Sequence, residues 1–328
     1  MDAQTLHYVG IDEAGYGPML GPLCVGVAWL VVRPWTPGGA APDLWSQLAG
    51  AVSPAVRGAA GRLVVADSKK TCQPLASGPG RLREAERTVS AFARAAGSAV
   101  AASDADLFEA LGVGMPPQPW YAGAPAGFPA HADAAEMAIA ANALRAALPA
   151  GGVEIRALRV IAMGEDRFNA IIERGGSKAA TTLAAMKEAL PTMLSAIAGT
   201  DEPACVRMVL DRQGGRTRYA AALADVLGRS VTPVAEAPAA SVYAIDGLAD
   251  ARVRVQPEAE LEHFPVALAS MAAKLVREML MERFNAYWGA RRPGIRPTAG
   301  YTTDARRWLG DMADVLDETN RRAMIRLA

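Results

Sequence analysis

The chain has 328 residues, enough for two average domains or for one large α/β domain with insertions. A hydrophobic content of 51% with 21% charged residues is typical of a globular protein and excludes a disordered one. Lysine plus arginine and aspartate plus glutamate both number 34, so the formal charge is zero. This balance does not indicate a strongly basic nucleic-acid binder, although it is compatible with a local basic face.

The cysteines and the apolar segments indicate the compartment. Cys24, Cys72 and Cys205 show neither paired nor zinc-type spacing, which is typical of reduced thiols in a cytosolic protein. The start of the sequence lacks the basic region and apolar stretch of a secretory signal. The longest apolar run, residues 23–32, is too short to span a bilayer. We therefore expect a cytoplasmic protein without a membrane association.

The first hundred residues predict a hairpin followed by short elements. Residues 5–14 and 22–33 are β-rich runs joined by a turn that contains glycine and proline, which predicts a β-hairpin. A short strand is expected near 62–66. Apolar residues at helical spacing predict a helix over 81–96. Residues 98–107 indicate a further strand that leads into an irregular segment.

A long loop and an alanine-rich helix follow. Residues 112–131 are rich in glycine and proline and are expected to form a loop that exposes Trp120 and Tyr121. Residues 132–149 predict the helix.

The remainder of the chain alternates strands with helices. We expect, in order, a strand near 156–163, a helix at 177–198, a strand ending at Asp211, a helix at 217–228, strands near 230–233 and 241–243, and a long helix at 265–288. No internal repeat is visible, which argues against a solenoid. Strands followed by helices predict an α/β fold with a central mixed sheet flanked by helices.

Acidic residues end two of the predicted strands. Asp12 and Glu13 follow the first apolar run, and Asp211 follows a later one. A single acidic pair is more typical of a solvated strand end. Side chains alternate along a strand, so Asp12 and Glu13 face one site only if the chain turns there, and residues 14–18 are expected to supply that turn.

Converging acids repel one another unless a divalent cation holds them. Ligand sets made only of oxygen favour Mg²⁺ or Mn²⁺ over zinc. The residue types and their placement therefore indicate metal-assisted phosphoryl transfer.

Several segments resemble one nuclease family in the family's order. They are GIDEAGYGPMLGPL from residue 10, DSKK at 67–70, VLD ending at Asp211, ALASMAAKLVRE at 267–278 and GYTT at 300–303. Together they resemble ribonuclease HII and its relative ribonuclease HIII, the type 2 ribonucleases H. The resemblance covers roughly residues 10–100 and 160–325.

The resemblance implies a fold, an activity and a cofactor. The fold is the ribonuclease H-like mixed sheet with a helical C-terminal region. The activity is that of a divalent-metal-dependent endoribonuclease, which cleaves the RNA strand of RNA–DNA hybrids or cuts at ribonucleotides embedded in DNA. Mg²⁺ or Mn²⁺ is the expected cofactor, and nucleic acid is the expected partner.

The resemblance also assigns catalytic and metal-binding residues. Asp12, Glu13 and Asp211 match three of the family's acids by position. Glu260, ten residues before Ser270, matches the remaining one. The nearby acids Glu258 and Glu262 leave the register of this match open.

Substrate-binding residues are implied in the same way. The stretch that reads the ribose 2′-hydroxyl in the family is matched by Gly15, Tyr16 and Gly17. A phosphate-contacting loop of the family is matched by Ser68, Lys69 and Lys70. Tyr301 matches a tyrosine that stacks on the sugar. Tyr16 departs from the family, which has arginine or lysine there. A phosphate contact is therefore lost or moved, and a related nuclease with an altered substrate remains an alternative.

Other matches are looser. Asn169 is expected to help to support the site. Whether Lys274 and Arg277 face nucleic acid is left open by the pattern.

The chain is expected to form a single ribonuclease H-like domain over 1–328, with a helical C-terminal part at about 265–328. An insertion at about 103–155 is atypical of the family and is expected at the surface as a lid, a partner surface or a spacer. A non-catalytic nucleic-acid-binding relative is the alternative of a different class. Protein partners are left open.

Overall fold

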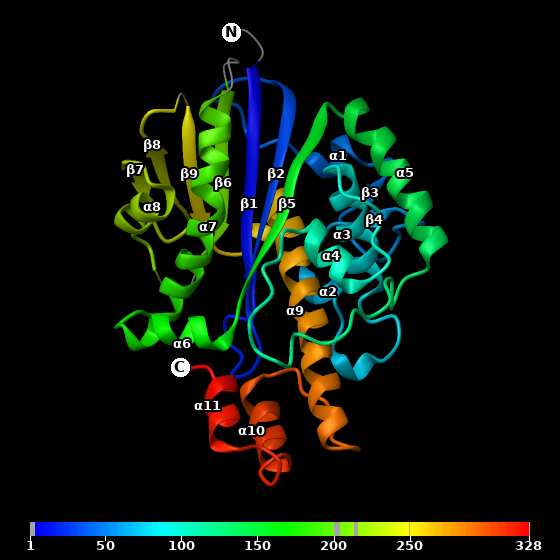
Figure 1. Ribbon diagram of the computed structural model, residues 1–328. Coiled ribbons are helices and arrows are strands. Elements are labelled where there is room, and N and C mark those ends of the chain that lie inside the picture. Colours follow the sequence, from blue (N-terminus) through cyan, green and yellow to red (C-terminus); the bar gives the residue numbers. More distant parts are fainter. Residues whose placement is uncertain (1–3, 200–203, 213–215, 249, 328) are drawn as a thin grey trace.

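A mixed sheet of seven strands runs through the computed structural model, which describes residues 4–199, 204–212, 216–248 and 250–327 (Figure 1). Its strand order is β5-β2-β1-β6-β9-β8-β7. The strands are β1 (Gln4–Ala14), β2 (Leu23–Trp35), β5 (Val153–Met163), β6 (Ala204–Asp211), β7 (Val231–Glu236), β8 (Ser241–Ile245) and β9 (Ala251–Gln256). β1, β6 and β9 are parallel neighbours, and the other pairs are antiparallel. β3 (Val52–Ser53) and β4 (Leu63–Val64) form a separate small sheet.

Helices flank the main sheet and continue beyond it (Figure 1). They are α1 (Leu44–Gln47), α2 (Ser68–Thr71), α3 (Arg83–Ala95), α4 (Asp104–Ala110), α5 (Ala134–Ala150), α6 (Glu165–Glu173), α7 (Lys178–Ala198), α8 (Ala220–Leu227), α9 (Phe264–Arg291), α10 (Thr302–Asp311), α11 (Glu318–Met324) and the short 3₁₀ helices η1 (Leu75–Ser77) and η2 (Ala259–Leu261). The predicted fold class, a mixed sheet flanked by helices with a helical C-terminal region, is confirmed.

Helix α9 packs directly on the backbone of the central strands. A Cβ atom added at Gly10 would lie 2.1 Å from the carbonyl carbon of Pro265, and one added at Gly26 would lie 2.1 Å from the carbonyl oxygen of Ala269. Only glycine permits so close an approach. The two glycines therefore fix the depth at which α9 lies against β1 and β2.

The alternation of side chains along β1 assigns its residues to the two faces of the sheet. Leu6 and Tyr8 belong to the hydrophobic core on the α9 face. Val9 and Ile11 belong to the core that α7 and α8 complete on the opposite face. By the same alternation Asp12 falls on the α9 face.

Residues 98–107 do not form the expected strand. Ser103 caps α4 instead, its side chain accepts a hydrogen bond from the Asp106 amide, and Asp106 bonds back to the Ser103 amide. This reciprocal capping stabilises a helix start rather than an extended chain. Strand-like pairing in this described segment is confined to an isolated bridge between Ser103 and Gly127.

The expected exposure of Trp120 and Tyr121 is wrong. Their exposed fractions are 1% and 0%. The ring centroid of Trp120 lies 6.0 Å from those of Phe284 and Trp288 on α9. The local sequence, rich in glycine and proline, does not predict this burial, because the apolar residues that the two rings contact belong to a helix far away in the sequence.

Strand β9 has no counterpart among the predicted elements. Its buried residues Val253 and Val255 alternate with the exposed residues Arg252 and Arg254, which is the period-2 pattern of a half-buried strand. The pattern was present in the sequence and was missed.

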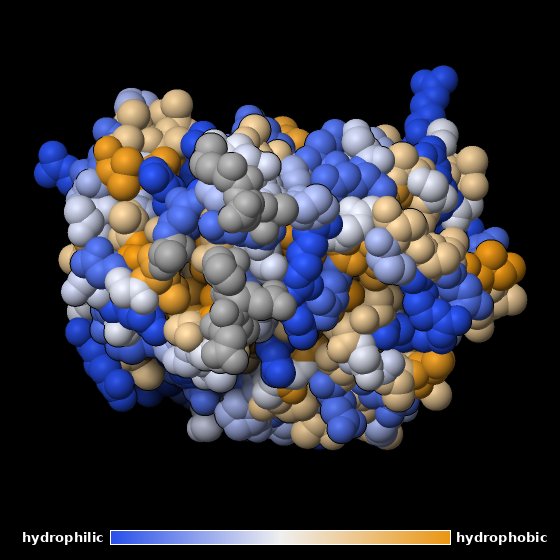
Figure 2. Space-filling model, turned by 90° about the horizontal axis from the view of Figure 1, so that it is seen from above, coloured by the Kyte–Doolittle hydropathy of each residue, from blue (hydrophilic) through white to orange (hydrophobic). Residues whose placement is uncertain are grey.

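The surface at the end of the sheet where β1 begins is seen in Figure 2. Hydrophobic residues are scattered there among hydrophilic ones. Among the described residues, no helix has both the length and the apolar character needed to cross a membrane.

Candidate active site

Two acidic side chains meet because β1 and β6 are parallel neighbours. Ile11 pairs with Leu210, so Asp12 and Asp211 come next to each other at the same end of the sheet. Asp211 Oδ1 accepts a hydrogen bond of 3.0 Å from the amide of Ala259, the first residue of η2. That short helix also carries Glu260. Three acids that lie far apart in the sequence are thus gathered at one end of the sheet.

The electrostatics of these acids show mutual repulsion in a desolvated setting. Burial raises the pKa of Asp12 well above its usual range, and the charges of Glu13 and Asp211 act in the same direction, against a hydrogen bond from Ser270. Burial likewise raises the pKa of Asp211. Burial and the charge of Asp211 raise the pKa of Glu260. Such a cluster favours the binding of positive charge.

Glu13 lies on the same strand as Asp12 but does not share its side. β1 continues through Ala14, which pairs with Cys24, and the chain turns only at Gly15, whose φ is +89°. The turn therefore comes too late to bring Asp12 and Glu13 onto one side of the strand. Glu13 still acts through its charge, which raises the pKa of both Asp12 and Tyr16 after the larger effect of burial.

Three acids compete for the remaining position, and their surroundings differ. Glu260 is partly buried, and its Oε2 has no hydrogen-bond partner among the described residues. Glu262 accepts a 2.9 Å hydrogen bond from the side chain of Gln256. Glu258 is exposed and has a left-handed backbone, with φ at +51°. Of the three, Glu260 combines proximity to Asp211 with an unused buried oxygen.

The donor set suits a hard divalent cation, but no closed cage is formed. Within the described residues, no three His, Cys, Asp or Glu side chains are grouped so as to hold a metal ion. Mg²⁺ is usually held by one or two carboxylates together with waters and substrate phosphates rather than by an all-protein cage. Asp12, Asp211 and the unpartnered oxygen of Glu260 fit this mode, in which the substrate completes the coordination.

A basic turn lies beside the acids. Asp67 caps α2 by accepting a 2.9 Å hydrogen bond from the Lys69 amide. Lys69 and Lys70 are exposed, and the charge of Lys69 lowers the pKa of both Asp211 and Glu260 against the larger effect of burial. Ser68 is buried and its Oγ lies 3.0 Å from Ser270 Oγ on α9. Ser270, which also bonds to Asp12, therefore links this turn to the acids.

The loop after β1 and the residues before α10 lie together. The carbonyl of Gly300 accepts hydrogen bonds of 2.8 Å and 3.1 Å from the amides of Met19 and Leu20. The next residue, Tyr301, is 49% exposed. An added Cβ at Gly17 would meet no atom within 4 Å, so the backbone there is open to a ligand. Gly17 and Tyr301 thus present an accessible backbone and an accessible ring.

Arg277 does not face solvent. Its side chain is completely buried, donates a 3.0 Å hydrogen bond to the carbonyl of Ala299 and lies against Gly15. Lys274 forms a 2.9 Å ion pair with Glu278. Arg277 therefore stabilises the loop that follows β1 from the protein interior and does not bind a ligand directly.

Some contributors to the site were not identified from the sequence. Ser270 is one, although a serine within an otherwise apolar helical stripe is a signal. Asp67 is another, and its position before a Ser-Lys-Lys turn is typical of a helix cap. Arg326, near the end of the chain, donates hydrogen bonds to the carbonyls of Gly15 and Tyr16. No local pattern predicts that contact.

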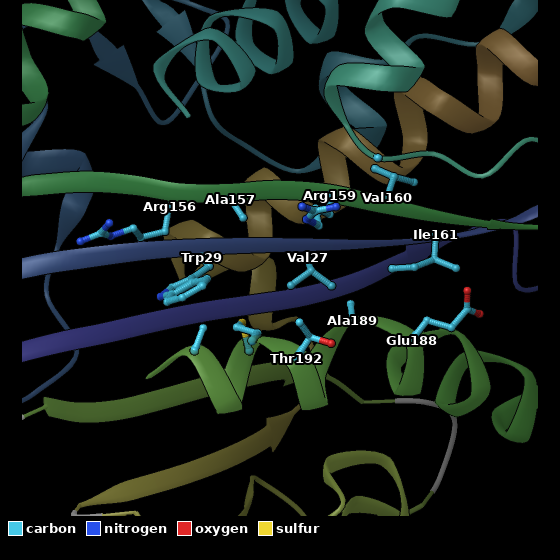
Figure 3. A pocket seen from close by; sticks show the side chains of 13 residues that line it. Val27, Trp29, Arg156, Ala157, Arg159, Val160, Ile161, Glu188, Ala189 and Thr192 are labelled. Atoms are coloured by element: carbon cyan, nitrogen blue, oxygen red, sulfur yellow. The ribbon is translucent and has the colours of Figure 1, made fainter. Parts of the chain in front are cut away.

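A cavity elsewhere contains none of these residues. It lies between α7 and the strands β2 and β5, and Figure 3 shows Trp29, Arg159 and Thr192 among its lining side chains. Its volume is about 470 Å³. The carboxylates lie instead at the end of the sheet where β1 and β6 finish.

Solved structures of ribonucleases HII and HIII resemble the chain. A structure of the complex of PCNA with ribonuclease HII from Archaeoglobus fulgidus matches with 13% identity and a TM-score of 0.47, over 98% of this chain and 94% of that one. The ribonuclease H2 of Pyrococcus horikoshii matches with 14% identity and a TM-score of 0.47, over 97% and 96%. Bst-ribonuclease HIII in complex with Mn²⁺ matches with 17% identity and a TM-score of 0.47, over 98% and 66%.

These neighbours belong to the family that the sequence motifs resemble. No family model matches the chain. No curated protein matches it either. At these identities, the function has to be argued from the residues of the chain itself.

Proposed function

We propose that the protein is a divalent-metal-dependent endonuclease that cleaves the RNA strand of RNA–DNA hybrids or cuts at ribonucleotides embedded in DNA. The observation that carries the proposal is the placement of Asp12 and Asp211 side by side at the ends of parallel strands, with Glu260 tied to them through the Ala259 amide. Desolvated acids that repel one another weaken a fold, so their presence together at one end of the sheet supports a role in holding a cation.

Asp12, Asp211 and Glu260 would hold the cation, with Glu13 adding negative charge beside Asp12. A divalent cation supplies Lewis acidity toward a phosphodiester and lowers the pKa of a bound water. Ser270 keeps the Asp12 carboxylate oriented through its hydrogen bond. The Asp211 carboxylate is oriented by the Ala259 amide. Cleavage by a water attacking in line would leave a 3′-hydroxyl on the product.

Nucleic-acid binding is assigned to the surface around the acids. Lys69 and Lys70 are exposed on a short turn next to the acids, where ammonium groups suit phosphate oxygens. The backbone at Gly15 and Gly17 approaches the ribose, whose 2′-hydroxyl distinguishes RNA from DNA. Tyr301 offers an exposed ring for stacking on the neighbouring sugar.

A panel of substrates tests this proposal. The purified protein is incubated with Mg²⁺ or Mn²⁺ and with a matched RNA–DNA hybrid, a DNA duplex with one ribonucleotide, an all-DNA duplex and double-stranded RNA. We expect cleavage of the first two alone and its loss when the metal is chelated.

Other outcomes of the panel are equally informative. Equal cleavage of the all-DNA duplex would show a general nuclease, an alternative that the departure at Tyr16 favours. Metal binding in calorimetry without cleavage of any substrate would show a non-catalytic binding protein.

A further inference from the structure

Three distant segments of the chain meet behind the loop that follows β1. They are the inserted loop with Tyr121, helix α6 with Glu165, and the C-terminal residues with Arg326. Figure 1 shows the C-terminus beside α6 at the lower end of the sheet, where β1 also ends.

Arg326 holds the loop through its carbonyl groups. Its Nη1 donates to the carbonyl of Gly15, and its Nη2 donates to that of Tyr16 over 3.1 Å. A longer contact of 3.4 Å joins Nη1 to the carbonyl of Gly21. The amide of Arg326 also donates a 2.9 Å bond to the carbonyl of Met19. Arg326 thus binds the loop both near its start, at Gly15 and Tyr16, and near its end, at Met19 and Gly21.

One face of α6 holds Arg326 in place. The guanidinium carbon lies 3.9 Å from the ring centroid of Phe168, a cation–π contact. Asn169 donates a 2.8 Å hydrogen bond from Nδ2 to the carbonyl of Ile325 and accepts one of 2.8 Å from the amide of Leu327. Phe168 and Asn169 follow Glu165 by three and four residues, so all three side chains project from the same face of α6.

The inserted loop reaches this network through Tyr121. Its hydroxyl donates a 2.7 Å hydrogen bond to Glu165 Oε1, and both residues are 0% exposed. Glu165 Oε2 is buried without a hydrogen-bond partner among the described residues. Buried polar groups of this kind are costly and call for an explanation.

Glu165 and Arg326 also interact electrostatically. Burial raises the pKa of Glu165 to about 7, and the charge of Arg326 opposes this. Burial, together with the charge of Arg277, lowers the pKa of Arg326 to about 10, and Glu165 opposes that shift. Each therefore stabilises the ionised form of the other in a setting that disfavours charge.

We propose that the inserted segment positions the 15–21 loop for discrimination of ribose from deoxyribose through a buried relay, in which Tyr121 binds Glu165 on α6 and the same face of α6 holds Arg326 against the loop. The proposal rests on the proposed function, because that function assigns sugar recognition to this loop. It gives the insertion a role that is neither a lid nor a spacer. The three are positioning residues, since none of them is assigned a contact with substrate.

Two measurements test the relay. Hydrogen–deuterium exchange reports the opening of residues 15–21 in the otherwise intact protein. Fluorescence anisotropy gives the ratio of the dissociation constants for an all-DNA duplex and for the same duplex with one ribonucleotide. An Asp211→Asn background, expected to be inactive, allows binding to be measured without cleavage.

Tyr121→Phe removes one hydroxyl and keeps the ring. Its matched control is Tyr243→Phe, since the Tyr243 hydroxyl also donates a 2.7 Å hydrogen bond to a glutamate, Glu236, on a strand remote from the loop. Arg326→Gln removes the positive charge, and Arg326→Lys is the conservative variant. Lysine keeps the charge and loses the planar fork, so partial rescue is expected.

We expect faster exchange at 15–21 in Tyr121→Phe and Arg326→Gln but not in Tyr243→Phe. The ratio of dissociation constants should fall about threefold in Tyr121→Phe and about tenfold in Arg326→Gln, since single buried hydrogen bonds and charge-assisted ones contribute on this scale. Arg326→Lys should lie between Arg326→Gln and the parent.

Unchanged exchange at 15–21 in Tyr121→Phe and Arg326→Gln would overturn the relay whatever the activity. Faster exchange with an unchanged ratio would overturn its role in sugar discrimination. A parent that binds both duplexes equally would instead overturn the proposed function, and with it sugar discrimination, while exchange would still decide whether the relay holds the loop.

Discussion

Glu278, which is buried, and the partly buried acids at the ends of β1 and β6 have opposite electrostatic surroundings. Glu278 on α9 lies among cations, with ion pairs of 2.8 Å to Arg81, 2.9 Å to Lys274 and 3.4 Å to Arg277. Although burial works against it, these cations lower the pKa of Glu278. Asp12 has the opposite balance, because burial and the charges of Glu13 and Asp211 all raise its pKa.

The contrast separates a structural charge from a functional one. A buried acid whose charge is neutralised by neighbours contributes to one fixed arrangement, and removing it leaves buried cations unpaired. An acid surrounded by other acids does not stabilise the fold when no cation is bound, whereas a bound cation offsets the repulsion between the acids and stabilises their ionised forms. The same type of side chain therefore predicts opposite consequences of substitution in the two places.

The largest expected effect is on cleavage at the strand-end acids. Asp211→Asn should lower cleavage of the hybrid by about 10³-fold or more, since a metal-stabilised transition state is worth several kcal/mol. Its free energy of unfolding should stay the same or rise, because one repelling charge is removed. Rates from a gel assay and urea unfolding curves measure both.

The control for this substitution is Asp104→Asn. Asp104 is buried in an ion pair of 2.7 Å with Arg283. We expect it to lose stability but to keep the cleavage rate per folded molecule. Near wild-type cleavage by Asp211→Asn would remove Asp211 from the catalytic assignment.

The next effect is on stability at α9. Glu278→Gln should lower the free energy of unfolding by about 3 kcal/mol, because the buried Arg277 then loses its counter-charge and Arg81 keeps only its ion pair with the more exposed Glu282. Urea unfolding at neutral pH measures this loss. If Glu278→Gln were as stable as the wild type, Glu278 would not have the stabilising role that distinguishes it here from the acids at the strand ends.

A pH effect of similar size is expected at Glu165. The folded protein keeps its proton up to a pKa of about 7, whereas the unfolded chain releases it near 4.5. The folded state therefore binds more protons between these values, so its stability falls as the pH rises through them. For this completely buried group the fall is about 3 kcal/mol.

Glu165→Gln isolates that contribution. The difference in unfolding free energy between wild type and variant, measured in urea at several pH values from 4.5 to 7, should change by this amount. A difference that is constant across the range would contradict a raised pKa at Glu165.

The smallest expected effect is on the salt dependence of binding. Tyr16→Arg restores a cation to the loop and should tighten hybrid binding, with a slope of log affinity against log salt steeper by about 0.9 for one added phosphate contact. The preference for ribose should hardly change. Anisotropy titrations at several salt concentrations test this.

The opposite result at this position has a definite meaning. Weaker binding by Tyr16→Arg would show that the Tyr16 ring stacks on the nucleic acid, a contact worth about 1–3 kcal/mol. Tyr16→Phe serves as the control, because it keeps the ring and removes only the hydroxyl.

Much of the fold was predictable from local patterns. The β1–β2 hairpin, β6 and the long helix α9 follow from apolar periodicity and from a glycine-containing turn. The strand expected at 98–107 does not form, because Ser103 and Asp106 make a capping box that starts a helix there. The candidate acids came from motifs and from their position after strands.

The sequence by itself therefore determined the order of most strands and helices, the fold class and which residues carry acidic or basic groups. Only the tertiary structure decided which of these groups meet, because parallel pairing of β1 with β6 joins residues that are about 200 positions apart. It also decided that Tyr121 is buried and that Arg326 reaches Gly15, 311 residues away. Periodicity reports the face of one element, whereas contacts of such separation depend on how all the elements pack together.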